Sequence, residues 1–436
     1  MIQMRVFLQK MSFSGIKNIK NEITIDFSNK KIGKDLEYTK VKAIYGPNGA
    51  GKTAVVDALK FYQALTNEKT KLYNPEFQEE VIETINKIVK EMTISLTGVI
   101  INDKSNTTTK ISHMITLAIK DKEVIITNEQ LKLYKDINSD SISKQINHNN
   151  TNIDFFKAGQ EKIIGYEFSK RSIVEMYNTY FKSMAGRKIT WEQLTDQDKE
   201  DFDFILNFFR LSESLYIISE DADKHSYYFY NKKEQENQKL KESTTRVRHS
   251  IYDEIVDNTD LEWYQSYYGK IESFVKVFKT DLVTIDLENK QINEKEVKIE
   301  KYFNYGTYRV HMEFESAGIK KLVKLYAAIH NAVHGRITVI DEFDANINDI
   351  YLNKLIEYVI FHAKGQIIFT THNTSPMDTL RNHKKAIDFI NESGELVNWI
   401  INGNSSPAKS YQNGAITGLP FNIDSFDFIG LFDEEN

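Results

Sequence analysis

The residues with the clearest chemical potential form one run, Gly46-Pro47-Asn48-Gly49-Ala50-Gly51-Lys52-Thr53, which matches the pattern GxxxxGK[ST] at every fixed position. Glycines let the backbone curl so that successive N–H groups point at phosphate oxygens. The spacing predicts that Lys52 reaches the β- and γ-phosphates of a nucleotide and that the Thr53 hydroxyl binds Mg²⁺. This run is therefore interpreted as a phosphate loop.

Two carboxylates, Asp341 and Glu342, follow the apolar run 337–340. At the tip of a strand, Asp341 would hold Mg²⁺ through its waters, and Glu342 would orient or deprotonate an attacking water. Such a run can also be an ordinary strand that ends in a solvated turn. The phosphate loop in the same chain favours the catalytic interpretation.

Two further motifs complete the set. His372 follows the run 367–371, one strand–helix–strand unit after Glu342, so the sheet is expected to place it beside the nucleotide. A histidine there would donate a hydrogen bond to the γ-phosphate. Glu315-Ser316-Ala317-Gly318 precedes a helical pattern, and a serine, a small residue and a glycine at a helix N-terminus can bind an anion. Taken alone, Ser316 could equally be an ordinary N-cap.

Hydrophobic periodicity predicts the elements that position these motifs. A strand over 41–45 and a helix over 52–64 flank the phosphate loop, as that motif requires. Strands alternate with helices again between 318 and 370, which implies a mainly parallel sheet. The remaining expected elements are an alternating strand pattern over 7–27, a helix over 77–90, and strands near 93–101, 110–119, 123–126, 282–287 and 308–314.

The predicted fold class is α/β, a P-loop ATPase head with a mixed sheet that is split along the chain. Residues 1–130 supply the phosphate loop, and residues 276–436 supply the other motifs. Residues 131–275 show helical spacing, for example at Phe202, Ile205 and Phe209, and are predicted to form a mainly helical insertion.

Composition narrows the class of protein. The chain has 436 residues, 41% of them hydrophobic, and a net charge of −6, so any nucleic-acid surface would be a local patch. The absence of cysteine excludes disulfides and thiolate zinc sites. No apolar run approaches the ~20 residues that a membrane helix needs, so we expect a cytoplasmic protein with no membrane partner.

The order of the four motifs resembles the ABC-type ATPase head shared by SMC, Rad50 and RecF proteins, and is most similar to the stand-alone AAA15-type ATPases, which are related to the ATPase part of OLD-family proteins. The likeness covers about residues 1–130 and 276–420. It implies Mg²⁺-dependent ATP hydrolysis in a head-to-head homodimer. Ser316 and Gly318 would contact the γ-phosphate bound by the partner's Lys52 and the partner's Thr53.

Further roles also come from the resemblance alone. Asp344, Ala345 and Asn346 would form the D-loop that crosses the interface, and His372 would be the switch histidine. The chain departs from the pattern at 347–349, which read Ile-Asn-Asp where many relatives have Leu-His-Pro, and at Ile319, where threonine is frequent. No convincing Q-loop glutamine follows the first helices.

The resemblance favours a dimeric sensor or regulatory subunit, of a bacterial anti-phage or toxin-like system, that controls a separately encoded effector such as a nuclease. The 64 residues after His372 are too few for the TOPRIM nuclease of OLD proteins. The Asp201/Asp203 and Asp221/Asp223 pairs and the helical pair His330/His334 are interpreted as surface or packing residues rather than metal ligands.

Two alternatives remain open. One is a RecF-like DNA-binding ATPase in DNA repair, for which the aromatic run 227–230 and the following lysines and arginines could supply a nucleic-acid surface, although acidic residues interrupt it. The other, an ABC transporter ATPase subunit, is disfavoured by the short Ser-x-Gly signature.

Overall fold

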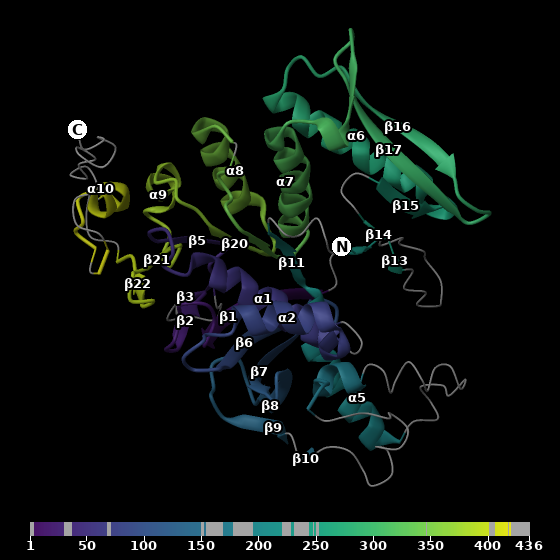
Figure 1. The fold of residues 1–436 in the computed structure, drawn as a ribbon. Coiled ribbons are helices and arrows are strands. Elements are labelled where there is room, and N and C mark those ends of the chain that lie inside the picture. Colours follow the sequence, from purple (N-terminus) through teal and green to yellow (C-terminus); the bar gives the residue numbers. More distant parts are fainter. Residues whose placement is uncertain are drawn as a thin grey trace, which may run out of the picture. The chain divides into compact units, whose positions relative to one another are not determined.

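The computed structural model of the chain divides into two compact units. The first contains residues 1–217, 331–343 and 352–436, and the second contains residues 218–330 and 344–351. The structure describes residues 4–29, 37–67, 71–149, 152–153, 169–177, 195–219, 228–230, 244–246, 248–249, 253–345, 347–400, 406–416 and 418–419. Each unit is built from segments that lie far apart in the sequence (Figure 1).

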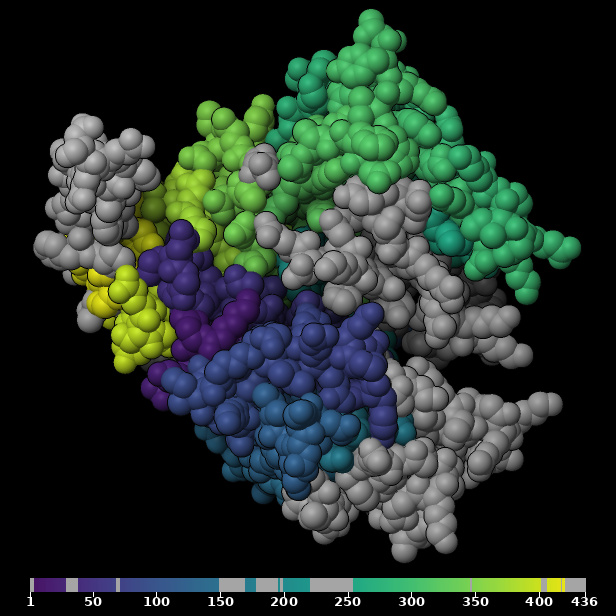
Figure 2. Space-filling model, viewed as in Figure 1, coloured from purple at the N-terminus to yellow at the C-terminus, as the bar shows by residue number. Residues whose placement is uncertain are grey.

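A largely parallel sheet forms one part of the first unit. Its strand order is β11-β19-β20-β5-β21-β22. Strands β19, β20, β5 and β21 run parallel to one another and β22 is antiparallel to β21, which confirms the predicted mainly parallel sheet. The strands are β5 (Val41–Tyr45), β11 (Leu215–Ile218), β19 (Ile337–Ile340), β20 (Gln366–Thr370), β21 (Ile387–Ile390) and β22 (Leu396–Asn398). Figure 2 shows purple residues from the start of the chain beside yellow-green residues from its last quarter, as this strand order requires.

The central strands are buried along their whole length, as expected where both faces of a parallel sheet are covered. Even so, β5 contains Lys42, whose Nζ lies 2.7 Å from Oδ2 of Asp388 on β21, with both side chains inaccessible to solvent. Burial lowers the pKa of Lys42, and the neighbouring Asp388 carboxylate opposes that effect. The pair lets a charged residue occupy a strand that sequence patterning treats as purely apolar.

An antiparallel sheet forms the other part of the first unit. Its strand order is β10-β9-β8-β7-β6-β1-β2. The expected strands near 7–27, 93–101 and 110–119 are confirmed, and the short strand expected at 123–126 is the start of a longer one. The strands are β1 (Met4–Ser14), β2 (Ile23–Asp26), β6 (Glu91–Asn102), β7 (Thr107–Lys120), β8 (Glu123–Tyr134), β9 (Ile142–Asn149) and β10 (Asn152–Ile153).

One buried amide ties the two sheets together. The Gln366 side chain, at the start of β20, accepts a hydrogen bond from the Leu8 N–H at 2.6 Å and donates to the Leu8 carbonyl at 3.1 Å. It also donates to the Thr39 carbonyl. Leu8 lies at a register shift in the pairing of β1 with β6, where backbone groups leave the regular ladder. Gln366 satisfies those groups from the other sheet.

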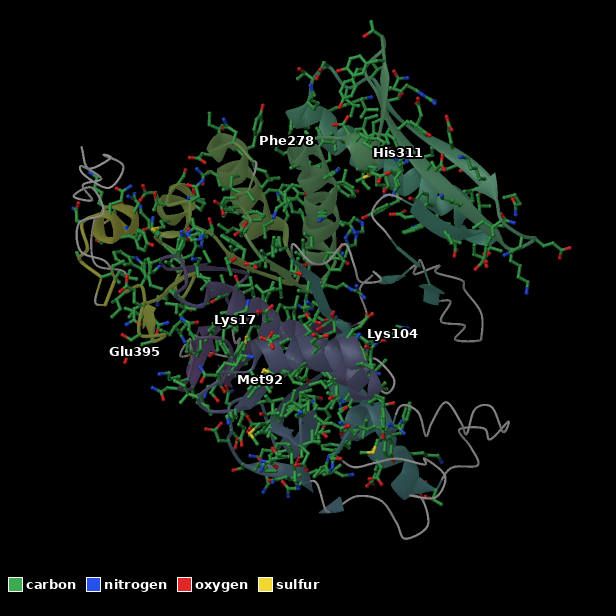
Figure 3. The ribbon with its side chains drawn as sticks, viewed as in Figure 1. Lys17, Met92, Lys104, Phe278, His311 and Glu395 are labelled. Atoms are coloured by element: carbon green, nitrogen blue, oxygen red, sulfur yellow. The ribbon has the colours of Figure 1, made fainter. Side chains whose placement is uncertain are left out.

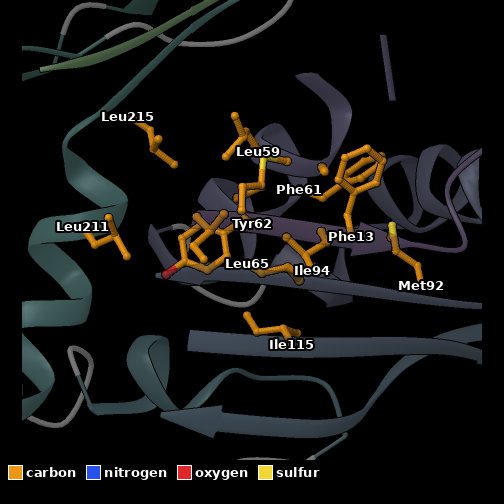
Figure 4. Close-up of a cluster of buried hydrophobic side chains, with 14 of the residues drawn as sticks. Phe13, Leu59, Phe61, Tyr62, Leu65, Met92, Ile94, Ile115, Leu211 and Leu215 are labelled. Atoms are coloured by element: carbon orange, nitrogen blue, oxygen red, sulfur yellow. The ribbon is translucent and has the colours of Figure 1, made fainter. Parts of the chain in front are cut away.

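The main core of the first unit lies between the antiparallel sheet and two helices, α1 (Lys52–Asn67) and α5 (Asp196–Glu213). Figure 4 shows side chains of α1 packed on those of the sheet, with leucines from α5 and β11 at one side. The labelled members are Phe13, Leu59, Phe61, Tyr62, Leu65, Met92, Ile94, Ile115, Leu211 and Leu215. The helix that carries the phosphate-loop lysine is therefore anchored along its length.

The prediction of a mainly helical insertion over 131–275 requires correction. Strand β9 pairs with β8 and extends the antiparallel sheet, and β11 joins the parallel sheet, so both belong to the first unit. The polar sequence of β9 hid it, because only Ile146 among its described apolar residues is buried. Helix α5, whose spacing suggested the insertion, packs into the core of the first unit.

The helix expected over 77–90 is also shorter. Helix α2 (Pro75–Thr84) begins at the Asn74 N-cap and ends before Ile85. Asn86 then accepts hydrogen bonds from the Ile88 and Val89 N–H groups, which closes a turn, and Lys90 has a positive φ of 57°. An asparagine side chain that bonds the backbone in this way ends a helix despite apolar spacing beyond it.

The second unit packs two helices on an antiparallel sheet of strand order β14-β15-β17-β16, with β18 beside β17. The expected strand near 308–314 is only the short β18, and β17 was not predicted at all. The elements are β14 (Arg248–His249), β15 (Asp253–Asp257), α6 (Leu261–Phe278), β16 (Thr284–Gln291), β17 (Glu296–Asn304), β18 (Arg309–His311) and α7 (Ala317–Val333). Strand β12 (Tyr228–Tyr230) pairs separately with β13 (Thr244–Arg246).

Among the described residues, no helix is long and apolar enough to cross a membrane.

A buried polar network braces the first unit. Glu129 on β8 accepts hydrogen bonds from His113 at 2.8 Å, from His148 at 3.3 Å and from the Ile173 N–H at 2.8 Å. His113 also bonds the Tyr62 hydroxyl of α1 at 2.9 Å. Burial alone would raise the pKa of Glu129, but the hydrogen bonds and charges of the two histidines outweigh it and lower that pKa.

This shift predicts an acid-dependent stability. A carboxyl whose pKa is lowered by folding stabilises the protein above its ordinary value of 4.5, and that contribution is lost as the pH falls through the folded pKa. We expect Glu129→Gln to reduce the free energy of unfolding by about 1–3 kcal/mol at neutral pH, and the difference to shrink below about pH 4.5. Denaturant unfolding of both proteins across that range measures it. A constant difference would contradict the assignment.

Candidate nucleotide-binding and hydrolysis site

The carboxyl ends of the parallel strands bring the predicted motifs of the first unit to one edge of the sheet. In register, Ile340 pairs with Phe369, Thr370 with Ile44, and Tyr45 with Phe389. Gly46 follows β5, Asp341 follows β19, and Thr371 and His372 follow β20. Ligands in open α/β sheets bind at this edge. The residues that carry these motifs therefore lie at the same edge of the sheet.

The phosphate loop has the backbone that its glycines allow. Gly49 and Gly51 have φ values of +76° and +108°, which strongly favour glycine. A Cβ on Gly51 would lie 2.6 Å from the Ile19 side chain, and one on Gly46 would lie 2.4 Å from the Ile390 carbonyl oxygen. A Cβ on Gly49 would meet nothing within 4 Å. The loop is packed closely at Gly46 and Gly51 and open at Gly49.

Lys52 begins α1 and turns back over the loop. Its Nζ donates to the carbonyls of Gly46 at 2.9 Å and Pro47 at 3.0 Å, and the residue is only 7% exposed. Thr53 follows in the same first turn, where unpaired N–H groups and the helix dipole favour an anion. The ammonium, the amides and the Thr53 hydroxyl are thus gathered at one helix start.

A turn near the N-terminus supports the loop and was not predicted. Gly15 and Lys17 have positive φ values, and Ile16 forms an isolated bridge with Ile19. The Asn18 amide donates to the Gly49 carbonyl at 2.7 Å, and Ile19 lies against Gly51. No spacing in the sequence connects this turn to residues some thirty positions later, so only the fold reveals the contact.

Asp57 is a second residue that the sequence analysis missed. It lies on α1 one turn beyond Thr53, and its carboxylate forms a 2.6 Å ion pair with Lys17, which Figure 3 labels. Burial raises the pKa of Asp57, and the Asp341 carboxylate adds to that rise against the opposing effect of Lys17. The Asp341 carboxylate after β19 therefore acts electrostatically on an acidic group of α1.

Asp341, which was predicted to hold Mg²⁺, and Glu342, which was predicted to activate water, share one hydrogen-bond partner. The Thr370 hydroxyl, at the end of β20, donates to Oδ1 of Asp341 and accepts the Glu342 N–H at 2.9 Å. The Thr370 carbonyl accepts the Phe343 N–H at 3.0 Å. Asp341 is 7% exposed, and Glu342 has a left-handed φ of +49°. A non-glycine residue in that conformation is uncommon and often marks a functional site.

His372 is exposed at the same edge. The preceding Thr371 is buried, and its N–H donates to the Ile44 carbonyl at 3.2 Å, which fixes the end of β20 beside the end of β5. The Thr371 hydroxyl accepts the Asn373 N–H at 3.0 Å and turns the chain after the strand. The histidine side chain is therefore displayed from a backbone that is fixed on both sides.

Ser316, Gly318 and Asp344 belong to the second unit. The Ser316 hydroxyl accepts the Ile319 N–H at 3.3 Å, so this serine is an N-cap of α7, and its side chain is exposed. Glu315 accepts hydrogen bonds from the Ser316 N–H and from the Tyr305 hydroxyl at 2.7 Å. The Asp344 carbonyl accepts the Ile347 N–H. Asn346 lies outside the described residues.

The residues at the edge fit a nucleotide with its magnesium ion. The loop offers amide donors and a lysine where a side chain on Gly46 or Gly51 would collide. Thr53 and Asp341 supply hydroxyl and carboxylate oxygens, the ligand chemistry that Mg²⁺ prefers. Glu342 adds a carboxylate that could accept a proton from water.

The structure describes part of the set of residues that the sequence analysis interpreted as surface or packing residues. His330 on α7 packs edge-on against the ring of Tyr267, and Asp201 on α5 pairs with Lys144 at 2.6 Å. Asp221 and Asp223 lie outside the described residues, as do Tyr227 and the lysines at 232–241 that could touch nucleic acid. Within the described ranges, no group of three or more His, Asp or Glu side chains is arranged to hold a metal ion by itself.

Comparison with known proteins identifies no family for this chain. No family model matches the chain, and no curated protein matches it in sequence. Among solved structures, the chain is similar to that described as "Structure of the recombination mediator protein RecF-ATPrS in RecFOR pathway", at 11% identity and a TM-score of 0.38. The match covers 91% of this chain and 99% of that chain. A likeness at this level assigns no activity to the chain.

Proposed function

We propose that the chain is an ATPase of the ABC type, which binds ATP with Mg²⁺ and hydrolyses it to ADP and phosphate. The observation that carries the proposal is the single sheet edge at which the phosphate loop, the Asp341–Glu342 pair and His372 follow adjacent parallel strands. A glycine loop or an Asp-Glu strand alone is common. Their meeting at one edge, with Lys52 at the helix start, suits phosphoryl transfer.

Each residue has a defined part in this reaction. The loop amides and Lys52 bind and orient the β- and γ-phosphates, which sets the γ-phosphorus in line for attack. Glu342 accepts the proton of the attacking water, and His372 donates a hydrogen bond to a γ-phosphate oxygen. Thr53 and Asp341 would hold the Mg²⁺ ion, which neutralises charge on the β- and γ-oxygens when bound.

The active site of this proposal is shared between two copies of the chain. Ser316 is exposed at the start of α7, where N–H groups and the helix dipole favour an anion. The resemblance to ABC-type ATPase heads implies contact between Ser316, Gly318 and the γ-phosphate held by the partner subunit. Asp344 would lie in the segment that crosses the interface. ATP binding then closes a dimer and hydrolysis opens it, which is a two-state element.

A bulky residue at position 316 tests this shared site. We expect Ser316→Trp to lower Mg²⁺-dependent ATP turnover by about 100-fold while the affinity of the monomer for ATP is unchanged, because the substitution blocks transition-state contacts from the other subunit. Ser273→Trp is the matched control, since Ser273 is an exposed serine on α6. Turnover and ATP binding are measured on all three proteins. Wild-type turnover in Ser316→Trp would exclude the shared site.

We further propose that this dimer is a sensor or regulatory subunit of a bacterial anti-phage or toxin-like system, with a separately encoded effector such as a nuclease. Only the motif resemblance supports this part. Native mass spectrometry of the tagged chain, expressed with its genomic neighbours, tests it. A stoichiometric second polypeptide is expected. A bare dimer that retains DNA would favour a RecF-like role in repair.

A further inference from the structure

The Thr370 side chain connects the two carboxylates of the proposed hydrolysis site. Thr370 is the last residue of β20 and is 1% exposed. Its hydroxyl has one hydrogen to donate, which goes to Asp341, and a lone pair that accepts the Glu342 N–H. Its carbonyl receives the N–H of Phe343. Three consecutive residues after β19 are therefore tied to one residue of the neighbouring strand.

Glu342 needs this support because of its backbone. A glutamate at a φ of +49° is strained, and such a conformation persists only where surrounding bonds hold it. The hydrogen bonds from residues 342 and 343 to Thr370 bracket the strained position on both sides. The rings of Phe343 and Phe369, 4.7 Å apart, fix the next residue against the same strand.

The threonine is suited to hold both groups at once. A β-branched residue on a strand has few side-chain rotamers, so the hydroxyl direction is set by the backbone of β20. The hydroxyl fixes the rotation of the Asp341 carboxylate while it holds the Glu342 backbone. His372 follows two residues later, so β20 positions parts of three motifs.

We propose that Thr370 is a positioning residue of the hydrolysis site. Its hydroxyl sets the Asp341 carboxylate for the metal and keeps Glu342 in the left-handed conformation that directs its carboxylate to the attacking water. This inference rests on the proposed ATPase activity and gives a role to Thr370, a residue of the run 367–371 to which the sequence analysis assigned none.

Two substitutions separate the hydroxyl from the shape of the side chain. Thr370→Val keeps the branched shape and removes the hydroxyl, and Thr370→Ser keeps the hydroxyl. We expect Thr370→Val to lower kcat by about 10- to 100-fold, the usual effect of losing an outer-shell partner, and to raise the Mg²⁺ concentration for half-maximal turnover. ATP affinity should not change. Thr370→Ser should stay within about threefold of wild type, because it retains both bonds.

Thr338→Val is the matched control, since Thr338 is equally buried on the adjacent β19. Wild-type kcat in Thr370→Val, or an equal loss in Thr370→Val and Thr370→Ser, would overturn the proposal. A wild-type chain that hydrolyses ATP no faster than Lys52→Ala would instead refute the ATPase function. A crystal structure of Thr370→Val tests the positioning role whether or not the chain hydrolyses ATP. The proposal predicts that residue 342 leaves its positive φ, and an unchanged φ contradicts it.

Discussion

Glu342→Gln is expected to bind ATP and to lose at least about 100-fold in turnover, since a positioned general base contributes about 10²- to 10⁴-fold. Glutamine keeps the size of the side chain and the backbone bond to Thr370, but it cannot take the proton of the attacking water. The ATP-bound form should therefore accumulate as a closed dimer. Assays of ATP turnover and of ATP binding measure the first effect, and the mass from analytical ultracentrifugation measures the second.

The control for this substitution is Glu357→Gln. Glu357 lies on α8 (Asp349–His362) in an exposed ion pair with Lys354, away from the strand ends that carry the motifs. The Glu357→Gln variant should hydrolyse ATP at the wild-type rate. If Glu342→Gln did the same, another group would have to activate the water, and the role assigned to Glu342 would be wrong.

Lys52→Ala should weaken ATP binding by about 100-fold or more. Charge-assisted hydrogen bonds are worth about 1.5–3 kcal/mol each, and each 1.4 kcal/mol is a factor of ten in affinity. The alanine removes the only side-chain cation that bends over the loop carbonyls of Gly46 and Pro47 in the described part of the site. Titration calorimetry with a slowly hydrolysed ATP analogue and Mg²⁺ measures the loss.

Lys60→Ala separates this effect from a change in helix stability. Lys60 lies on the same helix α1 and pairs with Glu80, two helical turns from the loop. We expect wild-type ATP affinity for this control and a far-UV circular dichroism spectrum like that of the wild type for both variants. Equal ATP affinity in Lys52→Ala and wild type would show that the loop does not bind the nucleotide.

Local pattern was sufficient to predict the elements that carry the motifs. Strand β5, helix α1, strands β19 and β20 and helix α7 lie where apolar runs and periodicity placed them, because each is either fully buried or strongly one-sided. The parallel direction of these strands also followed from the alternation of strands and helices. The meeting of Gly46, Asp341 and His372 at one edge is a consequence of that order.

Tertiary contacts explain what the sequence could not provide. Strand β9 is polar and becomes a strand by pairing with β8, and β17 contains the buried Lys301, which is paired with Glu254 at 3.0 Å. Strand β9 lacks a simple alternation of apolar and polar residues, and in β17 the alternation is interrupted at Lys301, which occupies a buried position. Helix α5 has clear helical spacing, but spacing does not say which core a helix joins.

The missed site residues have the same origin. Asn18, Asp57 and Thr370 act through side-chain contacts with residues that are distant in sequence, and the sequence analysis assigned a role to none of them. Thr370 looked like an ordinary strand residue before His372. Its two bonds to the Asp341–Glu342 pair depend on the register of β19 against β20, which a single sequence does not specify.

The most direct test of the central claim mixes two inactive variants. Lys52→Ala and Ser316→Trp should each fail to hydrolyse ATP, whereas a mixed dimer has one intact site, formed by Lys52 of one subunit and Ser316 of the other. In an equal mixture we predict about a quarter of wild-type turnover, because random pairing makes half of the dimers mixed. No recovery above the two variants measured alone would contradict an ATPase site that is shared between two copies of this chain.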